Sequence, residues 1–148
     1  MIRILLADDD PWSLTALEDL LAEESDLGIC ARCHNGHEVV QAVLEHNPDL
    51  MFLDIEMPGL SGLEAVEALG GQAPPVIFVT AWTGHALAAF DAAALDYLVK
   101  PVNPERLSRS LNRFRERNGA TALKEGVQAF LQEARAGHPP QQRLLRSE

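Results

Sequence analysis

Carboxylates, a hydroxyl and an amine follow short apolar runs at several points of this 148-residue chain. Asp8 and Asp9 follow the first run, Asp54 follows four consecutive apolar residues, and Thr80 and Lys100 end two later runs. Three neighbouring carboxylates repel one another unless a cation is bound between them. Mg²⁺ prefers such oxygen ligands, and a hydroxyl and an amine beside it can bind phosphoryl oxygens. The set suits phosphoryl transfer and does not resemble a general-base triad.

Each of these residues also has an ordinary structural interpretation. Asp54 precedes a Met-Pro-Gly turn and can cap it, as Asp often does. Thr80 can be a plain strand residue, and Lys100 can be a solvated surface cation. Their occurrence together, each at the end of an apolar run, favours one shared site over separate structural roles.

Short apolar runs bounded by turn residues would position this set. They predict strands at residues 2–7, 27–33, 50–53, 76–80 and 96–100. Helical spacing predicts a helix after each strand, around residues 11–24, 36–46, 63–69, 84–94 and 104–118. Such alternation favours an α/β fold with a doubly wound, five-stranded parallel sheet. The carboxyl ends of its strands would meet at one edge, where ligands bind in such folds.

The first two predicted helices have further sequence signals. Asp10 before Pro11 is typical of a helix start, because Asp is favoured as the N-cap and Pro at the first helical position. This gives Asp10 a capping role and leaves the acidic pair before it without one. The second predicted helix carries Val39, Val40, Val43 and Leu44 as its apolar residues.

The formal net charge of −10 argues against nucleic-acid binding by these residues, because such binding depends largely on Lys and Arg neutralising phosphates. The amino terminus is a short apolar run stopped by three aspartates, which is unlike a signal peptide. No run approaches the roughly 18 apolar residues of a membrane span. We expect a cytoplasmic protein that makes no membrane contact.

The two cysteines lie in the sequence Cys30-Ala31-Arg32-Cys33-His34, which matches both a redox pattern and a haem-attachment pattern. Haem attachment requires export, which the amino terminus does not indicate. A redox pair is expected at a helix start, whereas these residues fall in a predicted strand. Structural thiols are therefore the favoured interpretation.

Residues 2–114 resemble the receiver domain of two-component response regulators. The motifs that carry the resemblance are the Asp8-Asp9 pair, the pattern L-D-x-x-M-P-G-x-x-G around Asp54, Thr80 followed by Ala81, and Lys100 followed by Pro101. The resemblance implies a flavodoxin-like sheet with the strand order 2-1-3-4-5. It also implies a phosphoacceptor with slow self-catalysed phosphorylation and dephosphorylation, not an enzyme with a separate substrate.

By this resemblance Asp54 is the phosphoacceptor. Asp9, Asp54 and the main-chain carbonyl of Glu56 would bind Mg²⁺, and Asp8 would act largely through a bound water. Lys100 would bind the phosphoryl oxygens, and its peptide bond to the following proline would be cis.

The resemblance also implies a conformational switch. Thr80 would bind the phosphoryl group together with the lysine, and Tyr97 would move into the space behind Thr80. Glu56 and Trp82 lie two residues after the phosphoacceptor and the threonine, at positions that govern the rate of dephosphorylation in receivers. An indole at position 82 would shield the acyl phosphate.

The later motifs resemble the LytR/AlgR class, in which a linker joins the receiver to a LytTR-type DNA-binding domain. We therefore expect a receiver at residues 1–118, a linker helix at 119–136 and a flexible linker at 137–148, leading to an output domain that this chain lacks. The expected partners are a sensor histidine kinase and a second copy of the chain, bound through residues 84–114. DNA would be bound only through the missing domain.

Two other functions remain open from the sequence. A single-domain receiver could act in a phosphorelay or by docking on a partner protein. A hydrolase of the phosphoaspartate type shares the acceptor aspartate and Mg²⁺, but such enzymes resemble D-x-D at the nucleophile, and the pattern here is Asp54-Ile55-Glu56.

Overall fold

The computed structural model describes residues 1–81 and 94–117. The chain divides into two compact units, Met1–Leu107 and Ser108–Glu148. The first unit contains all the described strands, so the predicted site lies within it. The expected linker at residues 119–148 lies outside the described residues, and so does the expected helix at residues 84–94 except for Ala94, which is not helical.

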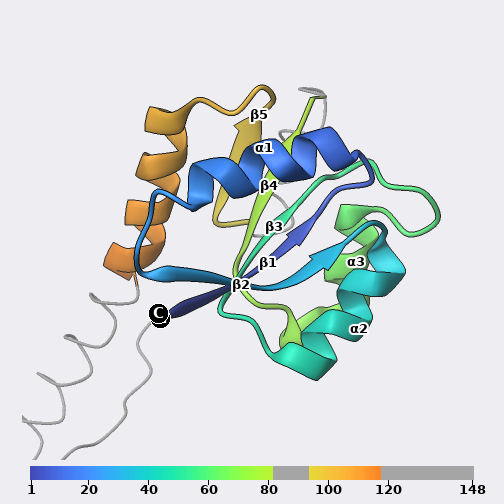
Figure 1. Ribbon diagram of the computed structural model, residues 1–148. Helices are drawn as coiled ribbons and strands as arrows, with labels where there is room; N and C mark the ends of the chain where they lie inside the picture. Colours follow the sequence, from blue (N-terminus) through green and yellow to red (C-terminus); the bar gives the residue numbers. More distant parts are fainter. Residues whose placement is uncertain (82–93, 118–148) are drawn as a thin grey trace, which may run out of the picture. The chain divides into compact units, whose positions relative to one another are not determined.

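Five strands form one parallel sheet in the first unit (Figure 1). They are β1 (Ile2–Ala7), β2 (Leu27–Cys33), β3 (Leu50–Leu53), β4 (Val76–Thr80) and β5 (Asp96–Val99). Their order is β2-β1-β3-β4-β5, and every neighbouring pair is parallel. The predicted α/β class and the strand order 2-1-3-4-5 are confirmed.

The central strand β3 is buried on both faces, which explains its unbroken apolar sequence. Leu50, Met51, Phe52 and Leu53 are all 0% exposed. Complete burial of one such side chain contributes about 1.5–3 kcal/mol. This burial fixes β3 in the middle of the sheet, and with it the position of the residue that follows.

The described helices include α1 (Pro11–Leu21), α2 (Gly36–His46) and α3 (Gly62–Leu69), with a 3₁₀ turn η1 (Gly70–Gln72) after α3. Residues 104–117 are also helical. Asp10 caps α1 as predicted: its Oδ1 accepts a hydrogen bond from the main-chain N–H of Trp12 at 3.1 Å. α1 ends at Leu21 rather than near Glu24, because the chain tightens there and Glu24 donates to the Leu21 carbonyl at 3.0 Å.

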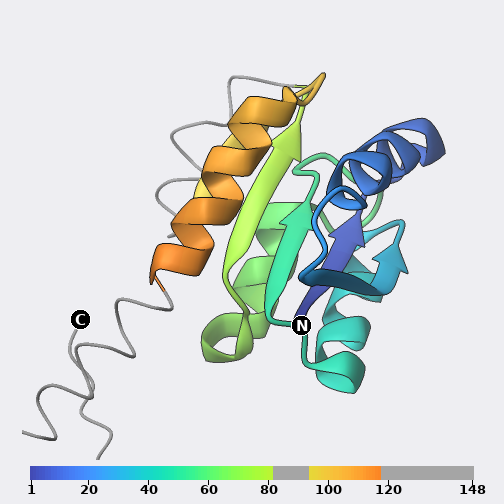
Figure 2. The same cartoon turned by 60° about the vertical axis from the view of Figure 1, so that its left-hand side comes forward.

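The two faces of the sheet are covered by different helices. Figures 1 and 2 show α2 and α3 side by side on one face and α1 on the other. The α2–α3 face has a core cluster in which Val39 and Leu69 join Leu53, Phe78 and Tyr97 of the sheet. Helices on both faces confirm the doubly wound arrangement around the described sheet.

One predicted core position on α2 is wrong. Val39 and Val43 are buried and Val40 is partly buried, but Leu44 is 62% exposed. Consecutive residues differ by about 100° around a helix, so the burial of Val43 turns its neighbour toward solvent. Ala42 is buried in its place.

Among the described residues, none of the helices is long and apolar enough to cross a membrane.

Candidate functional site

Two buried carboxylates lie side by side at the carboxyl ends of β1 and β3. Ala7 is paired with Leu53, and the main-chain N–H of Asp54 donates to the Ala7 carbonyl at 2.9 Å. Asp8 and Asp54 are therefore the first residues beyond adjacent strands. They are only 5% and 7% exposed. The register of the sheet thus brings together residues that are far apart in the sequence.

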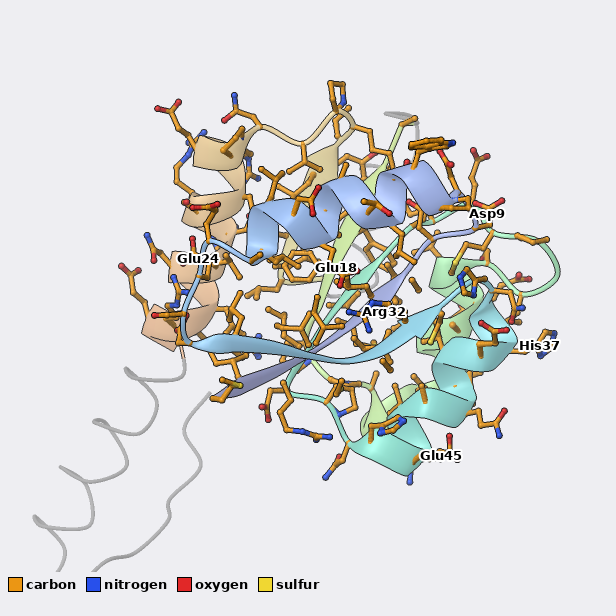
Figure 3. All side chains as sticks on the ribbon, in the orientation of Figure 1. Asp9, Glu18, Glu24, Arg32, His37 and Glu45 are labelled. Carbon is orange, nitrogen blue, oxygen red and sulfur yellow. The ribbon has the colours of Figure 1, made fainter. Side chains whose placement is uncertain are left out.

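Asp9 completes an acidic cluster, defined here as Asp8, Asp9 and Asp54. One carboxylate oxygen from each residue lies within 4.8 Å of the other two. Asp9 is exposed, and Figure 3 shows it beside the start of α1. The cluster therefore has two buried members and one that faces solvent, so a small cation could reach it from outside.

The Lys100 amine lies between the two buried members of the cluster. Its Nζ donates to Asp8 Oδ2 at 2.6 Å and to Asp54 Oδ2 at 3.0 Å. The main-chain N–H of Lys100 donates to the Thr80 carbonyl at 2.9 Å, which holds the end of β5 against the end of β4. The peptide bond from Lys100 to Pro101 is cis, as the resemblance implied.

Burial and ion pairing shift the pKa values of Asp8 and Lys100. The pKa of Asp8 is raised, chiefly because burial penalises its charged form; hydrogen bonds from Lys100 and from the main chain of Asp10 oppose this only in part. Burial alone would lower the pKa of Lys100, but its hydrogen bonds to Asp8 and Asp54 outweigh burial, and its pKa is raised. The amine is therefore charged at neutral pH.

Hydrogen bonds from main-chain groups two residues further along the chain orient both buried carboxylates. The main-chain N–H of Glu56 donates to Asp54 Oδ1 at 3.2 Å, and that of Asp10 donates to Asp8 Oδ1 at 2.9 Å. In each case the donor lies two residues after the Asp, as in an Asx turn. One oxygen of each carboxylate is thus held by the main chain, while the other faces Lys100.

Gly62 is a positioning residue that the sequence did not single out for the site. A Cβ atom at Gly62 would lie 2.2 Å from the Asp54 carbonyl oxygen, closer than real contacts allow. The N–H of Gly62 also donates to the Ile55 carbonyl at 2.9 Å. The start of α3 can approach the Asp54 loop only because residue 62 lacks a side chain. Its place in the L-D-x-x-M-P-G-x-x-G pattern was the available signal.

Two other predicted site residues, Thr80 and Tyr97, lie on β4 and β5. Thr80 is 1% exposed at the end of β4 and joins Lys100 through the main-chain bond described above. Tyr97 is 9% exposed and lies beside Phe78 in β4, on the α2–α3 face. Trp82 lies outside the described residues, so its shielding role stays a prediction.

The cysteine pair lies in β2, as the sequence indicated. Cys33 is buried and Cys30 is half-buried, and both are free thiols. Burial raises the pKa of Cys33 to about 12, and the charge of Glu38 adds to the effect. Because a nucleophilic cysteine must be a thiolate, Cys33 is unsuited to redox chemistry near neutral pH.

Comparisons with known proteins agree with this geometry. Residues 4–112 match the response regulator receiver domain family. An uncharacterized response regulatory protein of Shewanella oneidensis is 41% identical over 117 residues, which are 78% of this chain and 50% of that protein. Transcriptional regulatory protein BtsR of Escherichia coli K12 is 40% identical over 134 residues, which are 88% of this chain and 56% of that protein.

A solved structure gives the same result. The response regulator domain of Thermotoga maritima CheB is 28% identical and superposes with a TM-score of 0.68, covering 78% of this chain and 97% of that one. The present chain spans about half the length of the curated relatives it matches. The chain belongs to the response regulator receiver domain family of two-component signalling.

Proposed function

We propose that the chain works as a phosphorylation switch in which Asp54 accepts a phosphoryl group from a histidine kinase or a small phosphodonor. One observation carries the proposal: the Asp54 carboxylate ends the central strand, beside two further carboxylates and 3.0 Å from a lysine amine. A carboxylate in this setting can serve as a nucleophile, while the amine stabilises charge on the incoming group.

The acidic cluster fits Mg²⁺ by the chemistry of its donors. Its three residues offer only oxygen ligands, which a hard divalent cation prefers, and those oxygens lie within 4.8 Å of one another. Asp9, Asp54 and the main-chain carbonyl of Glu56 would hold the ion, with Asp8 acting largely through water. When bound, the ion would neutralise the carboxylates and the phosphoryl oxygens.

The chain's own residues divide the chemistry among them. An oxygen of Asp54 attacks phosphorus, a new O–P bond forms, and the bond from phosphorus to the donor breaks. Lys100 turns its amine from the Asp54 oxygen to a phosphoryl oxygen while Asp8 continues to hold it. The Thr80 hydroxyl binds a second phosphoryl oxygen. Slow attack by water later releases phosphate, with Glu56 and Trp82 tuning that rate.

The output of the switch would follow from added charge. A phosphoryl group brings about −1.5 to −2 charge at pH 7 and strong acceptor oxygens. We infer that it draws Thr80 and Lys100 toward the phosphate and that Tyr97 fills the space behind Thr80. The surface of residues 84–114 would then bind a second copy of the chain.

The parent protein would be a transcription regulator of the LytR/AlgR class with a LytTR-type DNA-binding domain. Two findings support the coarser part of this proposal, a transcription regulator longer than this chain: the chain spans about half the length of its curated relatives, and the Escherichia coli relative bears the name transcriptional regulatory protein. A reading frame that continues past residue 148 into a β-rich domain is the expected result. A stop codon directly after residue 148 would favour the single-domain receiver instead.

Intact mass spectrometry tests the phosphoacceptor. The chain is incubated with acetyl phosphate and Mg²⁺, and we expect a mass gain of one phosphoryl group. The gain should be absent from Asp54→Asn and from a chelated sample, and present in the matched control Asp19→Asn, an exposed carboxylate on α1. No gain in the unsubstituted chain with either a kinase or acetyl phosphate would contradict the proposal.

Size-exclusion chromatography tests the proposed dimer. Phosphodonor should shift the elution of the unsubstituted chain to that of a dimer and leave Asp54→Asn unchanged. A shift that is equal in both proteins would show that association does not depend on phosphorylation.

A further inference from the structure

A second, partly buried ion pair joins the two ends of the segment that carries Lys100. The Arg106 guanidinium binds both carboxylate oxygens of Asp96: Nη1 donates to Oδ2 at 2.9 Å and Nη2 donates to Oδ1 at 2.6 Å. The Asp96 side chain is 2% exposed and that of Arg106 is 34% exposed. Such fork-shaped pairing fixes direction as well as distance, which a single contact does not.

The same pair also binds the main chain of Tyr97. Asp96 Oδ1 accepts the Tyr97 N–H at 2.8 Å, and Arg106 Nη2 donates to the Tyr97 carbonyl at 3.3 Å. β5 is the last strand in the described sheet, where main-chain groups on the outer edge have no strand neighbour. Asp96 and Arg106 thus bind the main-chain N–H and carbonyl of Tyr97, which is the predicted switch residue.

Arg106 is itself held in place by the start of its helix. Asn103 Oδ1 accepts the main-chain N–H groups of Glu105 at 2.8 Å and of Arg106 at 3.0 Å. This is an N-cap arrangement, which fixes the first turn of the helix over residues 104–117. The cap holds the main chain of Arg106, and the side chain makes the fork-shaped contact with Asp96 from that first turn.

Lys100 lies near the middle of the segment that this pair closes. Asp96 and Arg106 form its ends, and the Lys100 amine reaches from it to Asp8 and Asp54. Holding the two ends together limits the conformations of the segment between them. The ion pair that joins the ends of this segment is thus formed by residues outside the acidic cluster.

We propose that Arg106 is a positioning residue that, through Asp96, sets the position of the Lys100 amine and of Tyr97; the part concerning phosphoryl transfer rests on the function proposed above. The Arg106 side-chain contacts described above go to Asp96 and to the Tyr97 carbonyl, both outside the acidic cluster. Its effect on phosphoryl acceptance passes through Lys100, so removing Lys100 removes the effect. This dependence separates a positioning role from a general contribution to stability.

A double-mutant cycle tests the proposal. The rate of phosphoryl acceptance from acetyl phosphate is measured at saturating Mg²⁺ for the unsubstituted chain, Arg106→Met, Lys100→Met and the double variant. We expect Arg106→Met to slow acceptance about 10- to 100-fold, the size expected from misplacing a group in a reactive site. In the Lys100→Met background the same substitution should have no further effect. An equal slowing in both backgrounds overturns the proposal.

A matched control is available on another part of the sheet. Arg32 makes a comparable fork-shaped contact with Glu18, but it joins β2 to α1 at the opposite end of the strand order (Figure 3). Arg32→Met should leave the acceptance rate unchanged in both backgrounds. If Arg106→Met does not fold, Asp96→Asn is substituted in the cycle, because its amide keeps the size of the carboxylate. Far-UV circular dichroism shows which variants fold.

A stability measurement tests the role of Arg106 independently of whether Asp54 accepts a phosphoryl group. Urea unfolding of the same four proteins gives the coupling between Arg106 and Lys100 without any phosphoryl transfer. If the unsubstituted chain accepts no phosphoryl group, the function proposed above fails, and this coupling alone decides the inference. Significant coupling supports it; strictly additive effects, as expected for Arg32→Met with Lys100→Met, overturn it.

Discussion

Replacing Lys100 with Met removes the cation that lies between two buried carboxylates. The amine is 2.6 Å from Asp8 Oδ2 and 3.0 Å from Asp54 Oδ2, and its side chain is 19% exposed. At an effective dielectric constant of about 20, each contact corresponds to about 6 kcal/mol of Coulomb attraction. Most of this is offset by the cost of burying the charges. Breaking a buried pair by removing one partner typically costs about 3–5 kcal/mol.

We therefore expect Lys100→Met to lower the free energy of unfolding by about 3–5 kcal/mol at pH 7 without Mg²⁺. Burial already raises the pKa of Asp8, and loss of the amine removes the contacts that oppose the rise. A carboxyl whose pKa is raised by folding binds its proton more tightly in the folded state than in the unfolded state. Its unfavourable contribution to the free energy of unfolding therefore decreases as the pH falls through the folded-state pKa. The deficit of the variant in the free energy of unfolding should therefore shrink as the pH is lowered below 7.

Urea unfolding with and without Mg²⁺ measures both effects. A divalent ion bound to the folded cluster stabilises the variant by mass action, so its deficit should decrease as Mg²⁺ is added. Arg32→Met is the control, because it removes an exposed pair and should show neither dependence. A deficit for Lys100→Met below about 1 kcal/mol, or one that neither pH nor Mg²⁺ changes, would refute the reasoning on buried charge.

Three further outcomes follow from the described contacts. Gly62→Ala should destabilise the fold by about 1–3 kcal/mol in urea unfolding and slow phosphoryl acceptance in mass assays, because its Cβ would meet the Asp54 carbonyl. The control Gly71→Ala has open space around its Cβ and should change neither the stability nor the rate of acceptance. Iodoacetamide at pH 8 should leave Cys33 unmodified until the chain unfolds, because burial raises its pKa to about 12; rapid modification of the folded chain would contradict this. Arg32→Met should change the free energy of unfolding by less than about 1 kcal/mol, since its pair with Glu18 is exposed, and a larger loss would show that the pair is not a simple surface contact.

Local sequence signals were sufficient for most of the fold. The buried run before Asp54 identified the central strand, and Asp10 with Pro11 identified the start of α1. Alternating strands and helices then predicted a parallel sheet, which brings Asp8 and Asp54 to one edge. These features were predictable because each depends on neighbouring residues or on a general rule of α/β topology.

The contacts that complete the site depend on the folded arrangement. No local pattern indicates that the Lys100 amine reaches two carboxylates at once, or that a Cβ at Gly62 would meet the Asp54 carbonyl. The pairing of Asp96 with Arg106 likewise depends on how β5 and the following helix lie. Leu44 was misplaced because helical spacing alone does not fix which side of α2 faces the sheet.

The role of Asp54 as phosphoacceptor is tested by locating the phosphoryl group on the chain. After incubation with acetyl phosphate and Mg²⁺, borohydride reduction converts an aspartyl phosphate to homoserine, and peptide mass spectrometry then identifies the residue. We expect homoserine at position 54 alone, with Asp8 and Asp9 unmodified. Reduction at another residue, or at none in a chain whose intact mass shows the phosphoryl group, would contradict it.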